Sequence, residues 1–214
     1  MGLSKSVKYA SLQDNPIVFE RDPVCRGKWN SEFFKNEHPI VLELACGKAE
    51  YTLGMARLFP EKNFIGVDIK GNRIWSAARL AGLDNLPNVA FIRDQIDKLH
   101  EYFLSYDIEE IWITFSDPYL RNGDHKKRLT SKKFLEVYKQ VLKESACIHL
   151  KTDSDVLYEY TKEVLAEVPS KIHKDYADVY AMNKNEELFG IQTYYEKMHL
   201  RDNRTIKYLC FSLL

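Results

Sequence analysis

The sequence has few cysteines, no net charge and no long apolar segment. Its four cysteines, at positions 25, 46, 147 and 210, form no C-x-x-C pair and no metal-ligand spacing, so we expect reduced thiols, as in a cytoplasmic protein. The six histidines show no ligand spacing either, and no metal site is predicted. No apolar run approaches the ~20 residues of a transmembrane helix, and the polar N-terminus does not resemble a signal peptide. We therefore expect a cytoplasmic protein without a membrane segment.

The balance of charge leaves the kind of partner open. Lys plus Arg and Asp plus Glu each number 31 among 214 residues, so any surface for nucleic acid has to be a local patch. Hydrophobic residues make up 45% and charged residues 29% of the chain, which is the range of folded domains and not of disordered chains. The length suits one domain with a substantial core.

The first part of the chain has no clear periodicity. Pro16, Pro23 and Gly27 interrupt residues 1–38, and basic and aromatic residues are mixed among them. We interpret 1–38 as an N-terminal arm or lead-in helix, which either packs on the main domain or reaches a polyanion. Residues 39–214 then form the main domain.

Short apolar runs alternate with amphipathic segments in the main domain. Buried strands are predicted at 40–44, 64–67, 89–92, 108–115 and 147–150, with helices after them, one of which includes Leu142. Further strands are predicted at 172–180 and 205–213, joined by a long polar connection at 181–204, a length that is usually functional. This alternation indicates an α/β fold: a doubly wound, mostly parallel, Rossmann-like sheet with helices on both faces.

Acidic residues stand at or near the carboxyl ends of five predicted strands: Glu43, Asp68, Asp94, Asp117 and Asp153. Ligands of doubly wound sheets bind past these ends, so the five carboxylates predict one site. Each carboxylate alone also fits a helix N-cap, which Asp favours, and this alternative is strongest for Asp153.

The turn after the strand at 40–44 lacks the G-x-G-x-x-G pattern of dinucleotide sites. Residues 43–50 (ELACGKAE) resemble instead the E-x-G-x-G-x-G turn of S-adenosylmethionine-dependent methyltransferases, with two alanines replacing glycines. Glu43 needs a partner in its apolar strand, which is either the ligand's ammonium group or a nearby backbone or basic group. Asp68 is placed to accept ribose hydroxyls, and Asp94 to accept an adenine amino group. Three acids suit this cationic ligand better than an anionic pyrophosphate.

The stretch 113–129 runs from an apolar strand into Asp117-Pro118-Tyr119 and then into a polar loop with four basic side chains. A carboxylate beside an aromatic ring suits a flat base, and the basic side chains suit a phosphate backbone. The alternative is a polar turn with solvated charges.

Three motifs, in this order, resemble those of the bacterial tRNA (guanine-N7)-methyltransferases over residues 38–213. Residues 115–119 (FSDPY), with the basic positions 121 and 126–128, resemble the family's F-P-D-P-W loop and the basic run after it. Residues 149–153 (HLKTD) resemble H-x-x-T-D, and residues 193–196 (TYYE) resemble T-x-[FY]-E. The chain departs from the family pattern at Ser116, Tyr119, Arg121, Gly123 and Asp124.

This resemblance implies methyl transfer from S-adenosylmethionine to N7 of a guanosine in the tRNA variable loop, with tRNA as the partner. Together with the turn, it implies a cosubstrate site formed by Glu43, Ala45, Gly47, Asp68, Asp94 and Asp117, of which Asp117 is the catalytic residue. It implies tRNA contacts from Arg121, Lys126, Lys127, Arg128, Asp153, Thr193, Tyr194, Tyr195 and Glu196. A monomer and a homodimer both fit the sequence.

Guanine N7 carries a lone pair and no proton, so it can attack a methyl group without a strong general base. Catalysis would rest on placement of the reactants and on carboxylates near the growing positive charge. Two rivals remain. Asp117-Pro118-Tyr119 faintly resembles the D-P-P-Y motif of amino-group methyltransferases acting on adenine or amides, and the missing glycines fit a non-enzymatic tRNA-binding protein. Binding of S-adenosylmethionine separates this last rival from the enzymes.

Overall fold

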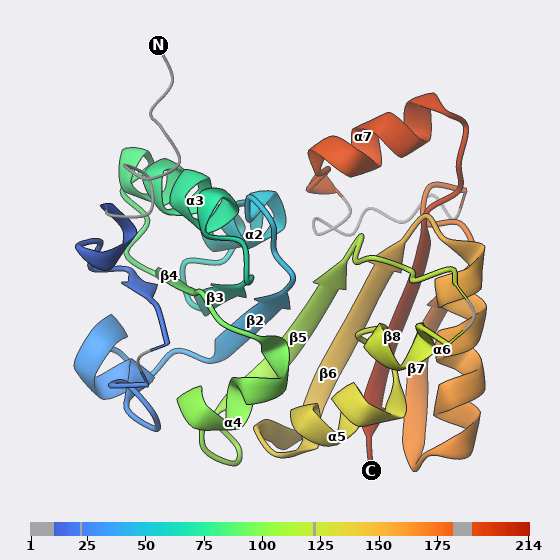
Figure 1. Ribbon diagram of the computed structural model, residues 1–214, viewed down its shortest axis with the longest axis horizontal. Coiled ribbons are helices and arrows are strands. Elements are labelled where there is room, and N and C mark those ends of the chain that lie inside the picture. The colour runs from blue at the N-terminus through green and yellow to red at the C-terminus, as the bar shows by residue number, and fades with distance from the viewer. Residues whose placement is uncertain (1–10, 22, 122, 182–189) are drawn as a thin grey trace.

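A computed structural model describes residues 11–21, 23–121, 123–181 and 190–214. This part of the chain forms an eight-stranded sheet in the order β1-β4-β3-β2-β5-β6-β8-β7 (Figure 1). The strands are β1 (Val18–Phe19), β2 (Ile40–Leu44), β3 (Asn63–Val67), β4 (Val89–Ile92), β5 (Ile108–Thr114), β6 (Leu142–Thr152), β7 (Ser170–Tyr176) and β8 (Lys207–Leu213). Strands β1 to β6 pair in parallel, whereas β8 runs antiparallel to β6 and β7.

Helices cover both faces of the sheet, and each face has its own hydrophobic cluster. The helical segments are η1 (Trp29–Phe34), α2 (Glu50–Leu58), α3 (Gly71–Leu83), η2 (Ile96–Lys98), α4 (Leu99–Tyr102), η3 (His125–Lys127), α5 (Lys132–Lys139), α6 (Asp155–Glu167) and α7 (Tyr194–Arg201). Apolar side chains of α2 and α3 fill one cluster, and those of η1, α4, α5 and α6 fill the other. The doubly wound, mostly parallel sheet predicted from the alternation of elements is confirmed.

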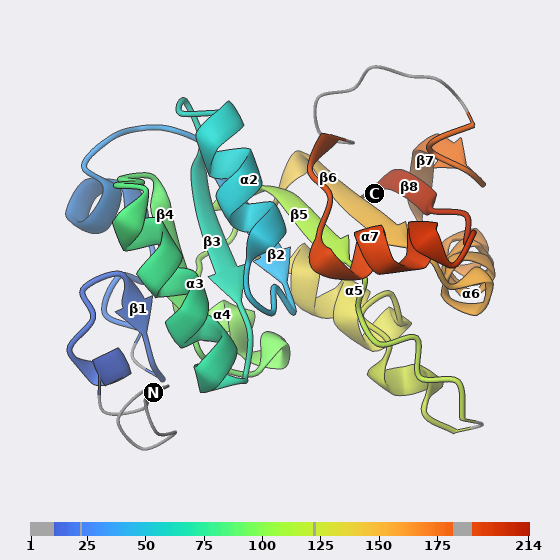
Figure 2. The same cartoon turned by 90° about the horizontal axis from the view of Figure 1, so that it is seen from above.

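Strands β2 and β5 lie side by side at the centre of the sheet, where the chain changes the direction in which it adds strands. Their register pairs Glu43 with Trp112 and Leu44 with Ile113, which brings the end of β2 beside Thr114. Figures 1 and 2 place α7 over the carboxyl ends of β5 and β6. The topology therefore predicts a ligand site at this edge, between β2, β5 and α7.

Several predicted boundaries were wrong. Helix α5 ends at Lys139, so Leu142 begins β6 and is not helical. The β5–β6 pairing is irregular, since its register shifts between the pairs Ile108↔Leu142 and Glu110↔Cys147. The first part of this long strand was therefore not recognised from the alternation of elements. Strand β7 ends at Tyr176 and not at residue 180. The short edge strand β1 was not predicted.

The connection predicted at 181–204 contains a helix. Residues 182–189 lie outside the described residues, but α7 begins directly after Thr193. The Thr193 side chain accepts a hydrogen bond from the Glu196 backbone N–H at 3.1 Å, which satisfies a free donor of the first turn. Thr-x-x-Glu is a known helix-start pattern, so a signal for this helix was present in the sequence.

Candidate active site

The turn between β2 and α2 adopts a conformation that usually requires glycine. Ala45, Gly47 and Ala49 have φ of 56°, 59° and 56°, all in the left-handed region where a Cβ is unfavourable. The backbone N–H of Gly47 donates to Asp68 Oδ2 at 2.9 Å. The alanines thus keep the glycine-type turn of the predicted cosubstrate motif, with strain at two positions.

Glu43 lies buried beneath this turn. Its Oε2 accepts from the Thr52 backbone N–H at 2.8 Å and from the Thr52 hydroxyl, and its Oε1 accepts from the Thr114 hydroxyl at 2.6 Å. Burial raises the pKa of Glu43 to about 7, and these hydrogen bonds only partly oppose the shift. The partners that Glu43 requires in its apolar strand therefore include a nearby backbone group, as one of the two alternatives predicted, and two threonine hydroxyls, which were not predicted.

A cavity of about 160 Å³ opens above Glu43. Ala45 and Gly47 line it from the turn, Phe115 from the end of β5, and residues 193–195 from the start of α7. A carboxylate at its base suits a cationic ligand better than an anionic one. This donor set fits S-adenosylmethionine, whose sulfonium and ammonium groups are positive.

Asp68 follows β3, which pairs with β2, and Asp94 follows β4, which pairs with β3. The Asp68 carboxylate accepts from the backbone N–H groups of Gly47 and Lys70, at 2.9 and 2.8 Å. Because a carboxylate has about four acceptor sites, Asp68 keeps capacity for ribose hydroxyls. Asp94 accepts from the Gln95 N–H at 2.7 Å and the Tyr102 hydroxyl at 2.9 Å, and its side chain is buried. Neither residue lines the 160 Å³ cavity itself.

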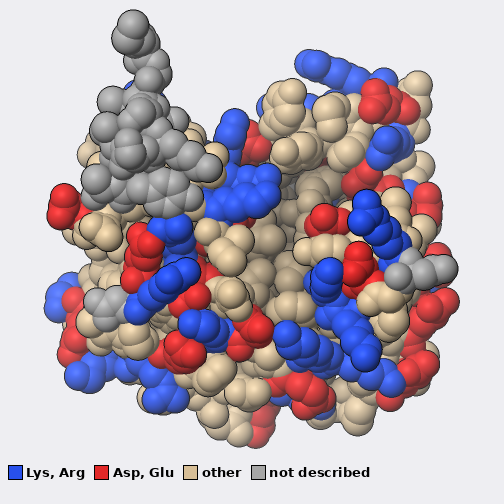
Figure 3. Space-filling model, in the orientation of Figure 1, with Lys and Arg blue, Asp and Glu red and all other residues tan. Residues whose placement is uncertain are grey.

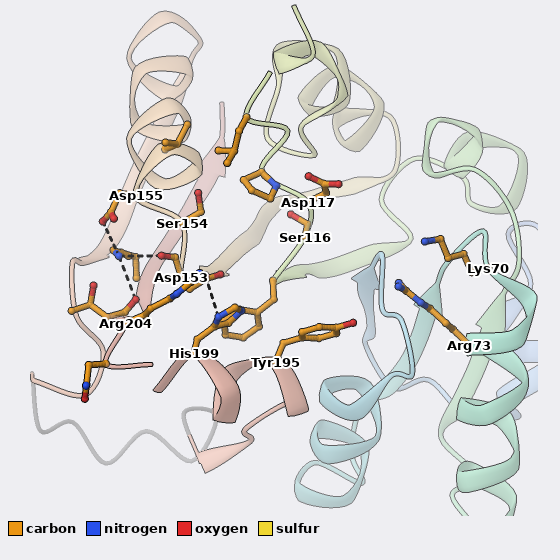
Figure 4. A pocket seen from close by; sticks show the side chains of 17 residues that line it. Lys70, Arg73, Ser116, Asp117, Asp153, Ser154, Asp155, Tyr195, His199 and Arg204 are labelled. Carbon is orange, nitrogen blue, oxygen red and sulfur yellow. Dashed lines mark hydrogen bonds and ion pairs between the residues drawn. The ribbon is translucent and has the colours of Figure 1, made fainter. Parts of the chain in front are cut away.

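Asp117 is exposed at the end of β5 and lines a second, larger cavity of about 880 Å³. Its Oδ1 accepts from the Tyr119 backbone N–H at 2.9 Å, which fixes the carboxylate at the turn. Ser116 beside it is buried, and its hydroxyl has no hydrogen-bond partner among the described residues. Figure 4 shows Asp117 and Ser116 on one side of this cavity and Tyr195 and His199 at its floor.

Asp153 lines the same cavity but is already engaged. Its Oδ2 lies 2.8 Å from Arg204 Nη1 and 3.4 Å from His199 Nδ1 (Figure 4). The N-cap of α6 is Ser154, whose hydroxyl accepts from the Leu157 N–H at 3.2 Å. The alternative that Asp153 caps this helix was therefore wrong.

The loop after Asp117 divides its basic residues between two roles. Arg128 is buried, donates to the carbonyls of Pro118 and Tyr119 at 2.8 and 3.1 Å, and stacks on Tyr160. It holds the loop together, so the predicted phosphate contact of Arg128 does not fit its position. Lys127 is exposed and pairs with Asp124 at 2.8 Å.

Arg121 and Lys126 are the exposed members of the loop for which no acidic partner occurs among the described residues. Their role as basic groups for tRNA stays a prediction. Figure 3 shows a hollow on this face with Lys and Arg side chains on both sides of it.

The four residues 193–196 also divide into exposed residues and residues that hold the structure together. Tyr194 and Tyr195 are 65% and 51% exposed and are available to a substrate. Thr193 caps α7, while Glu196 has no exposed surface and forms an ion pair with Lys151 at 2.8 Å. A direct tRNA contact predicted for Glu196 does not fit this burial, because its carboxylate is turned into the protein.

The two cavities meet at three residues that line both of them: Arg73, Phe115 and Tyr195. Arg73 projects from the first turn of α3, and sequence reasoning missed it because the basic pair Lys70 and Arg73 follows Asp68 without any recognised motif. A small cavity with an acidic base therefore joins a large one bounded by a carboxylate, aromatic rings and cations.

Within the described residues, no group of three or more His, Cys, Asp or Glu side chains has the geometry of a metal site. The same part of the chain contains no helix with the length and apolar character to span a membrane.

Comparison with known proteins agrees with this geometry. The family model Methyltransf_4, described as "Putative methyltransferase", matches residues 37–209. The tRNA (guanine-N(7)-)-methyltransferase of Bacteroides fragilis (strain YCH46) is 43% identical, over all of this chain and 87% of its own length. The enzymes of that name from Porphyromonas gingivalis (strain ATCC BAA-308 / W83) and Christiangramia forsetii (strain DSM 17595 / CGMCC 1.15422 / KT0803) are each 47% identical. The first alignment covers 96% of this chain and 82% of the relative, and the second 94% and 88%.

Solved structures show the same fold at low sequence identity. The 16S rRNA methyltransferase KamB has a TM-score of 0.64 at 16% identity, covering 86% of this chain and 91% of its own. The 30S ribosomal A1408 methyltransferase from an uncultured bacterium has a TM-score of 0.61 at 17% identity, covering 86% and 92%. Fold and site together define a Rossmann-like methyltransferase that uses S-adenosylmethionine as cosubstrate. The chain belongs to the family of tRNA (guanine-N(7)-)-methyltransferases.

Proposed function

We propose that this protein transfers a methyl group from S-adenosylmethionine to N7 of a guanosine in the variable loop of tRNA, in the cytoplasm. The observation that carries the proposal is the exposed Asp117 carboxylate in the large cavity, two residues after Phe115, which lines both cavities. The names of relatives at 43–47% identity support the guanine N7 reaction over the adenine and amide alternatives. The cavity above Glu43, whose lining fits S-adenosylmethionine, supports an enzyme over a non-enzymatic tRNA-binding protein.

S-adenosylmethionine, when bound, supplies an electrophilic methyl group on a positively charged sulfur. The guanine N7 lone pair forms the new bond, the methyl–sulfur bond breaks with its electron pair going to sulfur, and the purine becomes positive. No proton has to leave N7, so the protein needs no strong general base. Its main contribution is to hold N7 in line with the methyl group at the junction of the cavities.

Asp117 has two roles in this proposal. Its Oδ1 is held by the Tyr119 N–H, so the carboxylate is oriented before the substrate arrives. It accepts from the guanine N1–H and N2–H₂ groups, a pair of donors that adenine lacks. Its negative charge also stabilises the purine as it gains positive charge. Tyr195, 51% exposed at the floor of the cavity, offers a ring for base stacking.

The test is to incubate the purified protein with unmodified tRNA and labelled S-adenosylmethionine and to map modified nucleosides by mass spectrometry. We expect 7-methylguanosine at one variable-loop position, and none in a tRNA whose variable-loop guanosine is replaced. Asp117→Asn should lower turnover by ~10²-fold or more and leave the melting temperature nearly unchanged. Asp124→Asn, which alters a carboxylate of the same loop that does not line the cavity, is the matched control. A methylated adenine, or normal turnover in the Asp117→Asn variant, would contradict the proposal.

A further inference from the structure

One wall of the large cavity carries two cations that the proposed mechanism does not use. Lys70 precedes α3 and Arg73 lies in its first turn, and both line the cavity. Figure 4 shows their side chains directed into the space, across from Asp153 and Arg204. They lie on a different element from the loop of Arg121 and Lys126, so the cavity has basic groups on two separate walls.

Arg73 holds the position nearest to the reaction. Together with Phe115 and Tyr195 it lines both cavities. Its Nη1 atom forms an ion pair with Asp68 Oδ2 at 3.8 Å, a distance that is too long for a hydrogen bond. The Asp68 oxygens already accept from two backbone N–H groups. The Arg73 guanidinium, 36% exposed, therefore keeps its donors available for a ligand.

Lys70 adds a second cation at the mouth of the cavity. Its side chain is exposed, and no ion pair involving it occurs among the described residues. Helix α3 begins at Gly71 and has no acidic residue in its first turn. Asp68, just before the helix, accepts from the Lys70 backbone N–H at 2.8 Å, so the attraction for an anion comes from the Lys70 and Arg73 side chains, whose two positive charges exceed the single negative charge of Asp68.

We propose that Arg73 and Lys70 bind the phosphate groups flanking the target guanosine. This inference rests on the proposed function. For N7 to reach the methyl group, the base has to enter the junction between the cavities, and its own backbone then lies at the wall beside it. A guanidinium binds phosphate through two parallel hydrogen bonds, whereas lysine acts as a point charge. Arg73 therefore fixes the nucleotide in position, and Lys70 strengthens the attraction.

The competing role for Arg73 is to serve the cosubstrate, either directly or through Asp68. The two roles predict different losses. Binding of S-adenosylhomocysteine, measured by calorimetry, should stay within about two-fold of wild type in Arg73→Met if the guanidinium binds tRNA. A large loss of S-adenosylhomocysteine affinity with unchanged tRNA affinity would overturn the proposal.

The decisive measurement is the salt dependence of tRNA binding. Arg73→Met and Lys70→Met should each weaken binding, by about ten-fold for Arg73, and each should flatten the slope of log K against log salt by roughly one unit. Arg79→Met is the matched control, because Arg79 is exposed on the same helix but does not line the cavity. Equal behaviour of the Arg73 and Arg79 variants would mean that Arg73 belongs to a solvated surface.

A change on the ligand localises the contact. A tRNA with a neutral methylphosphonate at one of the two phosphates flanking the target guanosine should bind wild type more weakly and show no further loss with Arg73→Met. If the loss caused by the methylphosphonate and the loss caused by Arg73→Met add up at each of the two flanking phosphates, Arg73 contacts another part of the tRNA and the assignment is overturned. Nucleoside mapping with wild type separates this result from the proposed function, because it reports the methylated atom whether or not Arg73 contributes.

Discussion

Lys151 Nζ lies 2.8 Å from Glu196 Oε1, and neither side chain has any exposed surface. The Tyr180 hydroxyl donates to the same Glu196 oxygen at 2.7 Å, and the Lys151 ammonium lies 5.4 Å from the Tyr51 ring. Burial lowers the pKa of Lys151, and Glu196 opposes this shift. The pair fastens α7 to β6 and so fixes Tyr195 at the junction of the two cavities.

We predict that Lys151→Met and Glu196→Met each destabilise the fold by ~3–5 kcal/mol, because each leaves the other member of the pair as a buried charge without its partner. The double variant Lys151→Met/Glu196→Met should be more stable than either single variant, since it removes both charges. Urea unfolding curves measure all three. Lys132→Met, which breaks the exposed Lys132–Glu167 pair, is the control and should change stability by less than ~1 kcal/mol. A double variant as unstable as the sum of the singles would contradict this account.

Cosubstrate affinity should depend on pH through Glu43. Burial raises the pKa of Glu43 to about 7, so a substantial fraction of the carboxyl is neutral near neutral pH. The ionised form attracts the cationic ligand, so affinity for S-adenosylmethionine should rise between about pH 6 and about pH 8, with release of a proton. Calorimetry in buffers of different ionisation enthalpy detects that proton. In Glu43→Gln the affinity should be weaker and nearly independent of pH over this range; an unchanged pH profile would mean that another group titrates.

The alanines of the cosubstrate turn should be replaceable by glycine with a gain in stability. Ala45 and Ala49 both have φ of 56°, and relief of this strain outweighs the extra freedom of glycine in the unfolded chain. We expect Ala45→Gly and Ala49→Gly each to stabilise the fold by ~0.5–1 kcal/mol and to keep cosubstrate binding. Ala166→Gly, at an exposed position of α6, should instead destabilise by ~0.5–1 kcal/mol. Thermal unfolding would refute the idea if all three variants lost stability.

Acid should destabilise the fold through His149. Its ring stacks on Trp112 with centroids 4.0 Å apart, and its Nδ1 lies 2.8 Å from the Tyr208 hydroxyl. Burial lowers the pKa of His149 from 6.5 to about 4. Between these values the unfolded chain binds a proton that the folded chain does not, so stability falls as pH falls from about 6.5 to about 4, by up to ~3 kcal/mol. Urea unfolding of His149→Gln should show a flatter pH dependence than His125→Gln, a variant of an exposed histidine.

The parallel core was predictable because its strands are buried on both faces, which leaves apolar runs such as 89–92, and 40–44 with Glu43 as its one polar residue. The residues that convert the fold into a site were harder to predict. Arg128 and Glu196 stand in motifs that imply substrate contact, but tertiary packing turns both inward. Arg73 belongs to no recognised motif, and only the packing of α3 brings it to the cavities. Sequence spacing identifies which residues share an edge of the sheet, whereas the direction of each side chain depends on its neighbours.

The shared lining of the two cavities also bears on the order of events in each catalytic cycle. Because Tyr195 and Phe115 bound both spaces, a tRNA seated in the larger cavity covers the junction through which the smaller one communicates with it. We expect S-adenosylmethionine to enter first and S-adenosylhomocysteine to leave last. In steady-state product inhibition, S-adenosylhomocysteine would then be competitive with S-adenosylmethionine and non-competitive with tRNA. In a random order, it would be competitive with both substrates.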